Sequence, residues 1–146
     1  MAPGRSGVPL VPTILFADAD ERAREMVRDA LLEGTGPADL RTVASTTELG
    51  EYLQERPAPE LILLDADLPP EGAIHAVRSI KTNPALRRIP VVVLVSRLDP
   101  EANGEAYDAG ANTLIAKPVT FLALVKLMKV FTAYWLDAAA LPPDAA

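Results

Sequence analysis

Three unbroken apolar runs constrain the fold of this chain more than any other feature. They are "TILFA" (13–17), "LILLDA" (61–66) and "VVVLVS" (91–96), and none alternates apolar with polar residues as a half-exposed strand would. Such runs are typical of central strands covered on both faces. Two weaker candidates, 40–45 and 112–116, are shorter or more polar, and they fit strands nearer the edges of the same sheet.

Helical patterns separate and follow these runs. The predicted helices are a first one capped by Asp20 and stopped by Gly34 or Gly36, then 47–55, 73–81, 100–109 and 121 to about 135. The fourth helix is the weakest, because its apolar face is mostly alanine and Gly104 lies inside it. Strands that alternate with helices predict an α/β fold, a flavodoxin-like (βα)5 three-layer sandwich with a parallel five-stranded sheet in the order 2-1-3-4-5.

The length of 146 residues allows one substantial core and no second ordinary domain. We expect a domain at 13–136, a disordered N-terminal tail at 1–12 and a C-terminal tail at 137–146. The net charge of −6 argues against nucleic acid as a partner. The absence of cysteine excludes disulfides and thiolate chemistry. No apolar run approaches the roughly 18 residues of a membrane span, so we expect a cytoplasmic protein with no membrane partner.

Polar residues gather where the predicted strands end. Ligands of such sheets bind outside the carboxyl ends of strands 1 and 3, and the residues there or nearby are Asp18, Asp65, Asp67, Ser96 and Lys117. Clustered carboxylates repel one another unless a cation joins them, and their oxygens suit Mg²⁺. The pattern predicts a pocket in which Mg²⁺ and Lys117 neutralise a phosphoryl group that one aspartate accepts. The alternative is a plain salt bridge between Asp18 and Lys117.

Four segments resemble the receiver domain of two-component response regulators: "ILFADAD", "LILLDADLPPEG", "RRIPVVVLVS" and "AYDAGANTLIAKPV". The tail "FTAYWLDAAALPP" resembles the stand-alone receivers of phytochrome-type histidine kinases. The resemblance implies a single-domain phosphorelay protein, not an enzyme, whose partner is a sensor histidine kinase. It implies Asp65 as the phosphoacceptor and Lys117 as the phosphate contact, with a cis peptide before Pro118. It also implies a homodimer through helix 100–109, strand 112–116 and helix 121–135.

Ala19 departs from the receiver pattern at the metal site. Receivers usually end strand 1 with two adjacent acids, of which the second binds Mg²⁺ directly, and that second place is Ala19 here. The remaining metal ligands implied by the resemblance are Asp18, Asp65 and Asp67. We therefore expect Mg²⁺ binding that is weak or absent, and phosphorylation of Asp65 that is weak or absent.

The switch positions depart as well. Counting back from Lys117, the usual Thr or Ser falls on Val95, which lacks a hydroxyl. Ser96 is one place late and should point to the other face of the sheet. The usual switch aromatic falls on Leu114. These positions favour an alternative interpretation, a phosphorylation-independent pseudo-receiver that acts as a protein-interaction module.

A third hypothesis is a haloacid dehalogenase-like phosphatase. The stretches "LLDAD" and "LFADAD" match the opening motif of that family, whose first aspartate is the nucleophile. The family also needs an acidic pair after its lysine. Beyond Lys117 the only acids are Asp137 and Asp144, both close to the end of the sequence, so this is the weakest of the three hypotheses.

Overall fold

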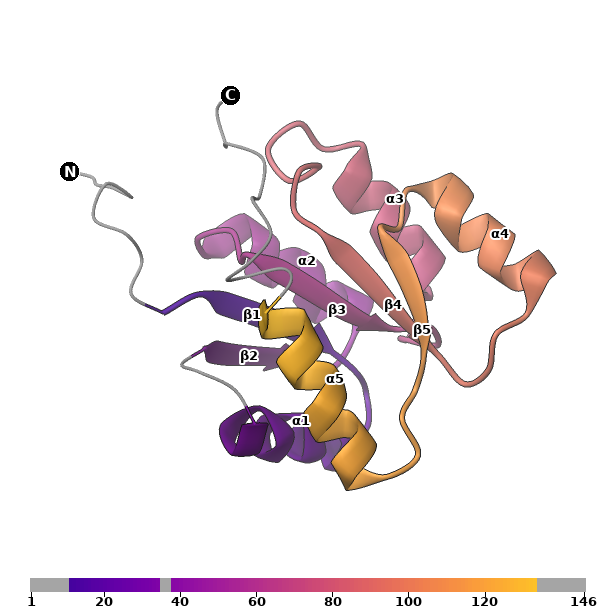
Figure 1. The fold of residues 1–146 in the computed structure, drawn as a ribbon. Helices are drawn as coiled ribbons and strands as arrows, with labels where there is room; N and C mark the ends of the chain where they lie inside the picture. Colours follow the sequence, from indigo (N-terminus) through magenta and orange to yellow (C-terminus); the bar gives the residue numbers. More distant parts are fainter. Residues whose placement is uncertain (1–10, 35–37, 134–146) are drawn as a thin grey trace.

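A parallel five-stranded sheet organises the molecule, in the predicted order β2-β1-β3-β4-β5 (Figure 1). The computed structural model describes residues 11–34 and 38–133. The strands are β1 (Thr13–Ala17), β2 (Asp39–Val43), β3 (Leu61–Asp65), β4 (Val91–Val95) and β5 (Thr113–Ala116). The three apolar runs form the central strands, and the two weaker candidates form the edges, as the sequence predicts.

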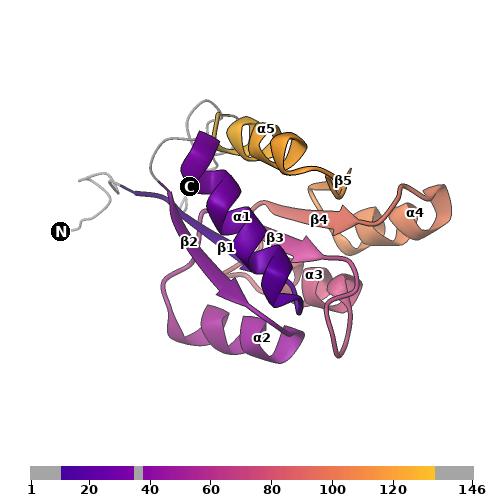
Figure 2. The same ribbon diagram turned by 90° about the horizontal axis from the view of Figure 1, so that it is seen from below.

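Five helices cover the sheet in two layers within the described residues. They are α1 (Glu21–Gly34), α2 (Thr46–Glu55), α3 (Ala73–Lys81), α4 (Pro100–Ala109) and α5 (Phe121–Phe131). Helices α1 and α5 lie on one face, and α2, α3 and α4 lie on the other (Figures 1 and 2). Residues 134–135 of the predicted last helix fall outside the described residues. None of the helices seen in these ranges has the length and apolar character needed to span a membrane.

The alternation of side chains along each strand supplies both faces of the core. In β1, Ile14 and Phe16 pack with α1 and α5, whereas Leu15 and Ala17 pack on the side of α2 and α3. All four are at most 1% exposed. Because β1 is buried on both faces, its end is fixed in space, and Asp18 follows directly at the carboxyl edge of the sheet.

Side-chain caps fix where two helices begin. Ser45 Oγ accepts a hydrogen bond from Glu48 N at 3.1 Å, and Glu48 Oε1 accepts one from Ala44 N at 2.8 Å. These two hydrogen bonds, which resemble a capping box, start α2 one residue before the predicted position. Helix α4 begins at Pro100 because Asp99 Oδ1 accepts a hydrogen bond from Glu101 N at 3.1 Å. This cap stabilises the N-terminus of a helix whose apolar face is weak.

Candidate functional site

Two aspartates lie buried at the carboxyl edge of the sheet. Asp18 follows β1 and is 5% exposed, and Asp65 ends the neighbouring strand β3 and is 6% exposed. A buried carboxylate is costly unless hydrogen bonds or opposite charges compensate it. Asp18 Oδ1 accepts a hydrogen bond from the backbone N of Asp20 at 2.9 Å. The structure thus brings together the first and third strand ends, where the sequence predicts the pocket.

Lys117 supplies the opposite charge. Its Nζ forms an ion pair with Asp65 Oδ1. The backbone N of Lys117 donates to the carbonyl of Val95 at 2.8 Å, which holds the lysine beside the end of β4. The ion pair is therefore with the predicted phosphoacceptor, not with Asp18 as in the simpler alternative.

The pKa shifts show how charge is balanced in this pocket. Burial lowers the pKa of Lys117, but the hydrogen bond and charge of Asp65, with the charges of Asp18 and Asp67, outweigh it and raise that pKa. Burial raises the pKa of Asp18; the hydrogen bond from Asp20 opposes this, and the charge of Asp65 adds to it. Lys117 stays protonated at neutral pH, so the pocket contains its own cation.

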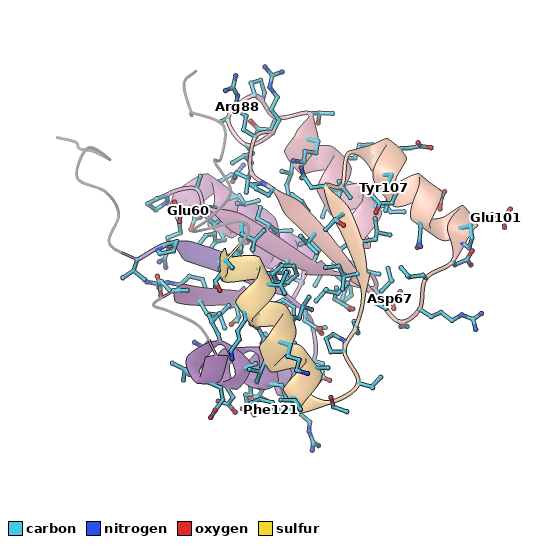
Figure 3. All side chains as sticks on the ribbon, viewed as in Figure 1. Glu60, Asp67, Arg88, Glu101, Tyr107 and Phe121 are labelled. Atoms are coloured by element: carbon cyan, nitrogen blue, oxygen red, sulfur yellow. The ribbon has the colours of Figure 1, made fainter. Side chains whose placement is uncertain are left out.

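The pocket offers two buried carboxylates, Asp18 and Asp65, to a metal ion. Asp67 is exposed in the loop after β3 (Figure 3), and Ala19 offers no side-chain oxygen. Asp20 caps α1 by accepting a hydrogen bond from Arg22 N at 3.0 Å. Across residues 11–34 and 38–133, no three Asp, Glu or His side chains lie close enough to hold a metal ion. Mg²⁺ is usually held by one or two carboxylates and several water molecules, so Asp18 and Asp65 would hold it with water completing most of its octahedral shell.

The predicted switch positions are mostly apolar. Val95 is partly buried and packs against the core on the side of α2, α3 and α4. Ser96 is exposed. Leu114 is buried, and its backbone N donates to the hydroxyl of Tyr107 at 3.3 Å. The aromatic ring at this edge of the sheet therefore comes from α4 (Figure 3).

Two features of the site differ from or add to the sequence prediction. Arg24 Nη1 donates to the backbone carbonyl of Asp18 at 2.7 Å, a contact that the sequence analysis missed. The only sequence signal for this contact is a basic residue in the first turn of the helix that follows Asp18. The cis peptide bond among the described residues joins Pro69 to Pro70, so the cis bond expected before Pro118 was wrong.

Comparison with known proteins gives a consistent result. The family model described as response regulator receiver domain matches residues 14–129. Response regulator Rcp1 of Synechocystis sp. is 34% identical over 103 residues, which cover 70% of this chain and 69% of Rcp1.

Solved structures agree in fold. The phosphorylated cyanobacterial phytochrome response regulator RcpA superposes with a TM-score of 0.83 at 29% identity, over 91% of this chain and 99% of that one. The Mn²⁺-bound form of Rcp1 gives 0.79 at 28% identity, over 90% and 99%. The sheet order, the buried Asp65 and its pairing with Lys117 fit this match, and the chain belongs to the response regulator receiver domain family.

Proposed function

We propose that this receiver accepts a phosphoryl group on Asp65 at a site of low efficiency, in a phosphorelay with a phytochrome-type sensor histidine kinase. The observation that carries the proposal is the ion pair between Asp65 and Lys117 at the carboxyl edge of the sheet. The phytochrome connection comes from the likeness to Rcp1 and RcpA. In this role the chain is a signalling module and not an enzyme.

The transfer uses groups that the pocket contains. A carboxylate oxygen of Asp65 forms a bond to phosphorus as the P–N bond of the kinase phosphohistidine breaks, and the leaving imidazole nitrogen takes up a proton. Lys117 would then shift its hydrogen bond from the carboxylate to a phosphoryl oxygen, where it offsets the added negative charge. Arg24 holds the carbonyl of Asp18 and so positions the loop at the mouth of the pocket.

Two substitutions support low efficiency. Ala19 removes the acid that would bind Mg²⁺ directly, so we propose that metal binding by Asp18, Asp65 and Asp67 is weak or absent. Val95 presents methyl groups where a hydroxyl would bind a phosphoryl oxygen. With Lys117 already paired to Asp65, the pocket is neutralised in part without metal.

The apolar surface beside the pocket is a docking surface for the histidine kinase in this proposal. Just after Lys117, the side chains of Val119 and Phe121 are 95% and 41% exposed. Phe121 lies at the first turn of α5 (Figure 3). Exposed apolar side chains next to a charged pocket are typical of docking surfaces. A helical kinase domain could cover them while presenting its phosphohistidine to Asp65.

The second candidate function is a protein-interaction module that signals without phosphorylation. The buried Leu114 favours it, because an aliphatic side chain there cannot change ring orientation in response to a phosphoryl group. In this reading the same surfaces bind partners constitutively. The two functions differ in one measurable property, the modification of Asp65.

Intact mass spectrometry after incubation with a small-molecule phosphodonor and Mg²⁺ tests the proposal. We expect partial gain of one phosphoryl group in the wild type and none in Asp65→Asn. Asp29→Asn is the matched control, since it removes an exposed acid on α1 that has no role in the proposed transfer, and this variant should still be modified. Absence of modification in the wild type would favour the interaction module, and modification of Asp65→Asn would move the acceptor elsewhere.

A further inference from the structure

A groove between α2 and α3 lies outside the phosphoryl site. It has a volume of about 400 Å³ and is lined by residues of both helices and of the segments that flank α3. Its apolar lining includes Leu49, Leu53, Ile80 and Leu86, which belong to the core on this side of the sheet or pack against it. A cavity of this size with an apolar floor can hold several side chains of a bound segment.

Gly50 contributes no side chain to the α2 side of this groove. It lies in the interior of α2, where glycine costs about 1 kcal/mol relative to alanine. A Cβ added to Gly50 would meet no atom within 4 Å, so the fold itself does not require glycine. The missing side chain leaves bare helix backbone at the groove, which permits the close approach of another backbone.

The charge at the groove is negative. Glu51 and Glu71 line it, and none of the described residues that line it is a lysine or arginine. Glu71 is engaged, because its Oε1 pairs with His75 Nε2 at 3.2 Å and accepts from Thr46 Oγ1 at 3.3 Å. The side chain of Glu51 is exposed and makes no hydrogen bond or ion pair with the described part of the chain. The groove therefore favours an occupant with apolar side chains and a cation that can reach Glu51.

The two terminal segments outside the described residues differ in this chemistry. Residues 1–10, "MAPGRSGVPL", contain one cation, Arg5, no acid, and the aliphatic residues Val8 and Leu10. Residues 134–146 contain Asp137 and Asp144 and no base. Only the N-terminal segment has the charge and the apolar content that the groove favours.

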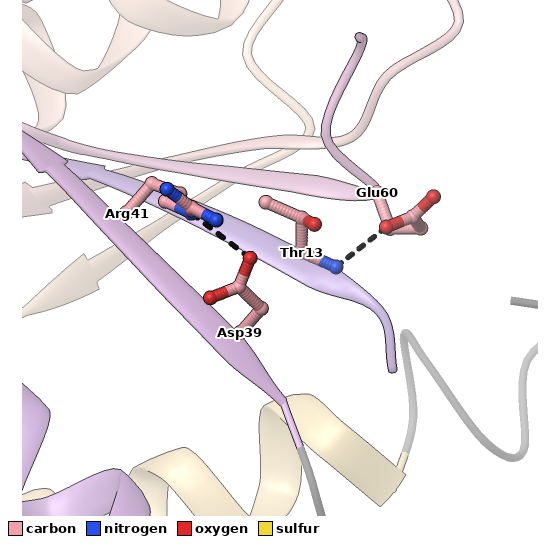
Figure 4. Close-up of polar contacts among 4 residues, drawn as sticks. All are labelled: Thr13, Asp39, Arg41 and Glu60. Atoms are coloured by element: carbon pink, nitrogen blue, oxygen red, sulfur yellow. Dashed lines mark hydrogen bonds and ion pairs between the residues drawn. The ribbon is translucent and has the colours of Figure 1, made fainter. Parts of the chain in front are cut away.

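The N-terminal segment also joins the described chain close to α2, at Val11. Val11, Tyr52 and Arg56 line a smaller groove of about 240 Å³ near the end of α2. Thr13 N donates to Glu60 Oε1 at 2.6 Å, which anchors the start of β1 there (Figure 4). Glu51 precedes Tyr52 on the helix. Arg5 lies six positions before Val11, and an extended chain of that length spans up to about 20 Å, so Arg5 can reach Glu51.

We propose that residues 1–10 dock in the α2–α3 groove of their own chain, with Arg5 paired to Glu51 and the aliphatic residues over the floor near Gly50. An extended segment can fill such a groove without secondary structure of its own. The segment would cover a surface remote from Asp65 and would compete with any partner that uses α2 and α3. This goes beyond the phosphoacceptor role and does not depend on it.

Paramagnetic relaxation tests the proposal on the full chain. Because the sequence has no cysteine, Ser6→Cys gives a single position for a spin label. We expect the label to broaden the backbone amides of Gly50, Gln54 and Ser79 on the groove. The broadening should disappear in Glu51→Lys and persist in Glu55→Lys, a matched charge change on α2 that does not line the groove. Reversing both partners, with Arg5→Glu and Glu51→Arg, should restore it.

Three outcomes would overturn the proposal. Broadening confined to residues around Val11 would mean that the segment stays near its point of attachment. Broadening unchanged by Glu51→Lys would mean that the segment reaches the groove without the predicted pair. Broadening that appears in a mixture of spin-labelled chains with separate ¹⁵N-labelled chains would mean that a second copy occupies the groove.

Discussion

The two buried aspartates of the pocket are compensated in different ways. Asp65 has a direct cationic partner in Lys117, whereas Asp18 is compensated mainly by a backbone hydrogen bond from Asp20 and less by the charge of Lys117. Burial and the charge of Asp65 therefore raise the pKa of Asp18 above its ordinary value of 3.8. Since the folded state holds the proton of Asp18 more tightly than the unfolded state, ionised Asp18 destabilises the fold at neutral pH.

Asp18→Asn should therefore stabilise the protein at pH 7. Asparagine keeps an oxygen acceptor for Asp20 N and removes the buried charge. We expect a rise in Tm at pH 7, because the variant no longer carries a buried charge that destabilises the fold. As pH rises from the ordinary pKa of Asp18 through its raised pKa in the folded state, the wild type should lose stability. The variant should show no such loss. Thermal unfolding from pH 3 to 7 measures this, and a variant less stable than the wild type at pH 7 would contradict it.

At the scale of elements, the sequence predicts which segments are strands and helices better than where they end. The unbroken apolar runs identify β1, β3 and β4 because both faces of these strands are covered. The ends shift by one or two residues where local hydrogen bonds decide them. The start of α2 is an example, since the hydrogen bonds of Ser45 and Glu48 place it one residue before the position that the apolar pattern predicts. The contact between Lys81 and Gly110 joins segments far apart in sequence and could not be predicted from local pattern.

Helix α4 ends at its C-cap Gly110, which adopts a left-handed conformation and lies close to Lys81. Gly110 has φ +114° and lies so close to Lys81 that an added Cβ would be 2.8 Å from Lys81 Cγ. The lysine cannot move freely, because its Nζ donates to the carbonyls of Ile89 and Arg87 at 2.7 and 3.1 Å.

Gly110→Ala should lower the free energy of unfolding by roughly 1–3 kcal/mol through strain and displacement of Lys81. Gly104→Ala is the matched control within α4, where an added Cβ meets no atom within 4 Å. It should instead stabilise the protein by about 0.5–1 kcal/mol. Urea unfolding of both variants measures the two effects, and equal stabilities would argue against the described contact.

At the scale of the whole molecule, the face formed by α4, β5 and α5 suits self-association. Tyr107, Leu122 and Val130 are 49%, 64% and 58% exposed on its helices. The exposed charges on α4 are acidic and those near Leu122 on α5 are basic, namely Glu101, Glu105, Asp108, Lys126 and Lys129. A two-fold axis would bring opposite signs together around the apolar residues. Tyr134 and Trp135, the aromatic residues at the end of the predicted last helix, lie outside the described residues.

We predict a homodimer through this face that does not depend on phosphodonor. Leu122→Glu should give a monomer by light scattering, because it places a carboxylate in the apolar part of the contact. Leu32→Glu is the matched control on α1, at a leucine that is 80% exposed and lies off this face. A monomeric wild type, or a dimer that survives Leu122→Glu, would rule out this interface.

The candidate site was predictable in its residues and less so in its interactions. Strand ends and winding place Asp18, Asp65 and Lys117 at one edge of the sheet, and the structure brings them together there. The choice of Asp65 over Asp18 as the partner of Lys117 depends on three-dimensional distances that no spacing rule supplies. The hydrogen bond from Arg24 to the Asp18 carbonyl also depends on such distances.

The central claim is that Ala19 leaves this receiver without a working magnesium site and that Lys117 provides the cation instead. Calorimetric titration of Mg²⁺ into the wild type and Ala19→Asp tests it most directly. We predict no saturation of the wild type in the millimolar range, and tighter binding by Ala19→Asp, because the variant regains a ligand and a negative charge. Tight binding by the wild type, or no gain in Ala19→Asp, would contradict the account.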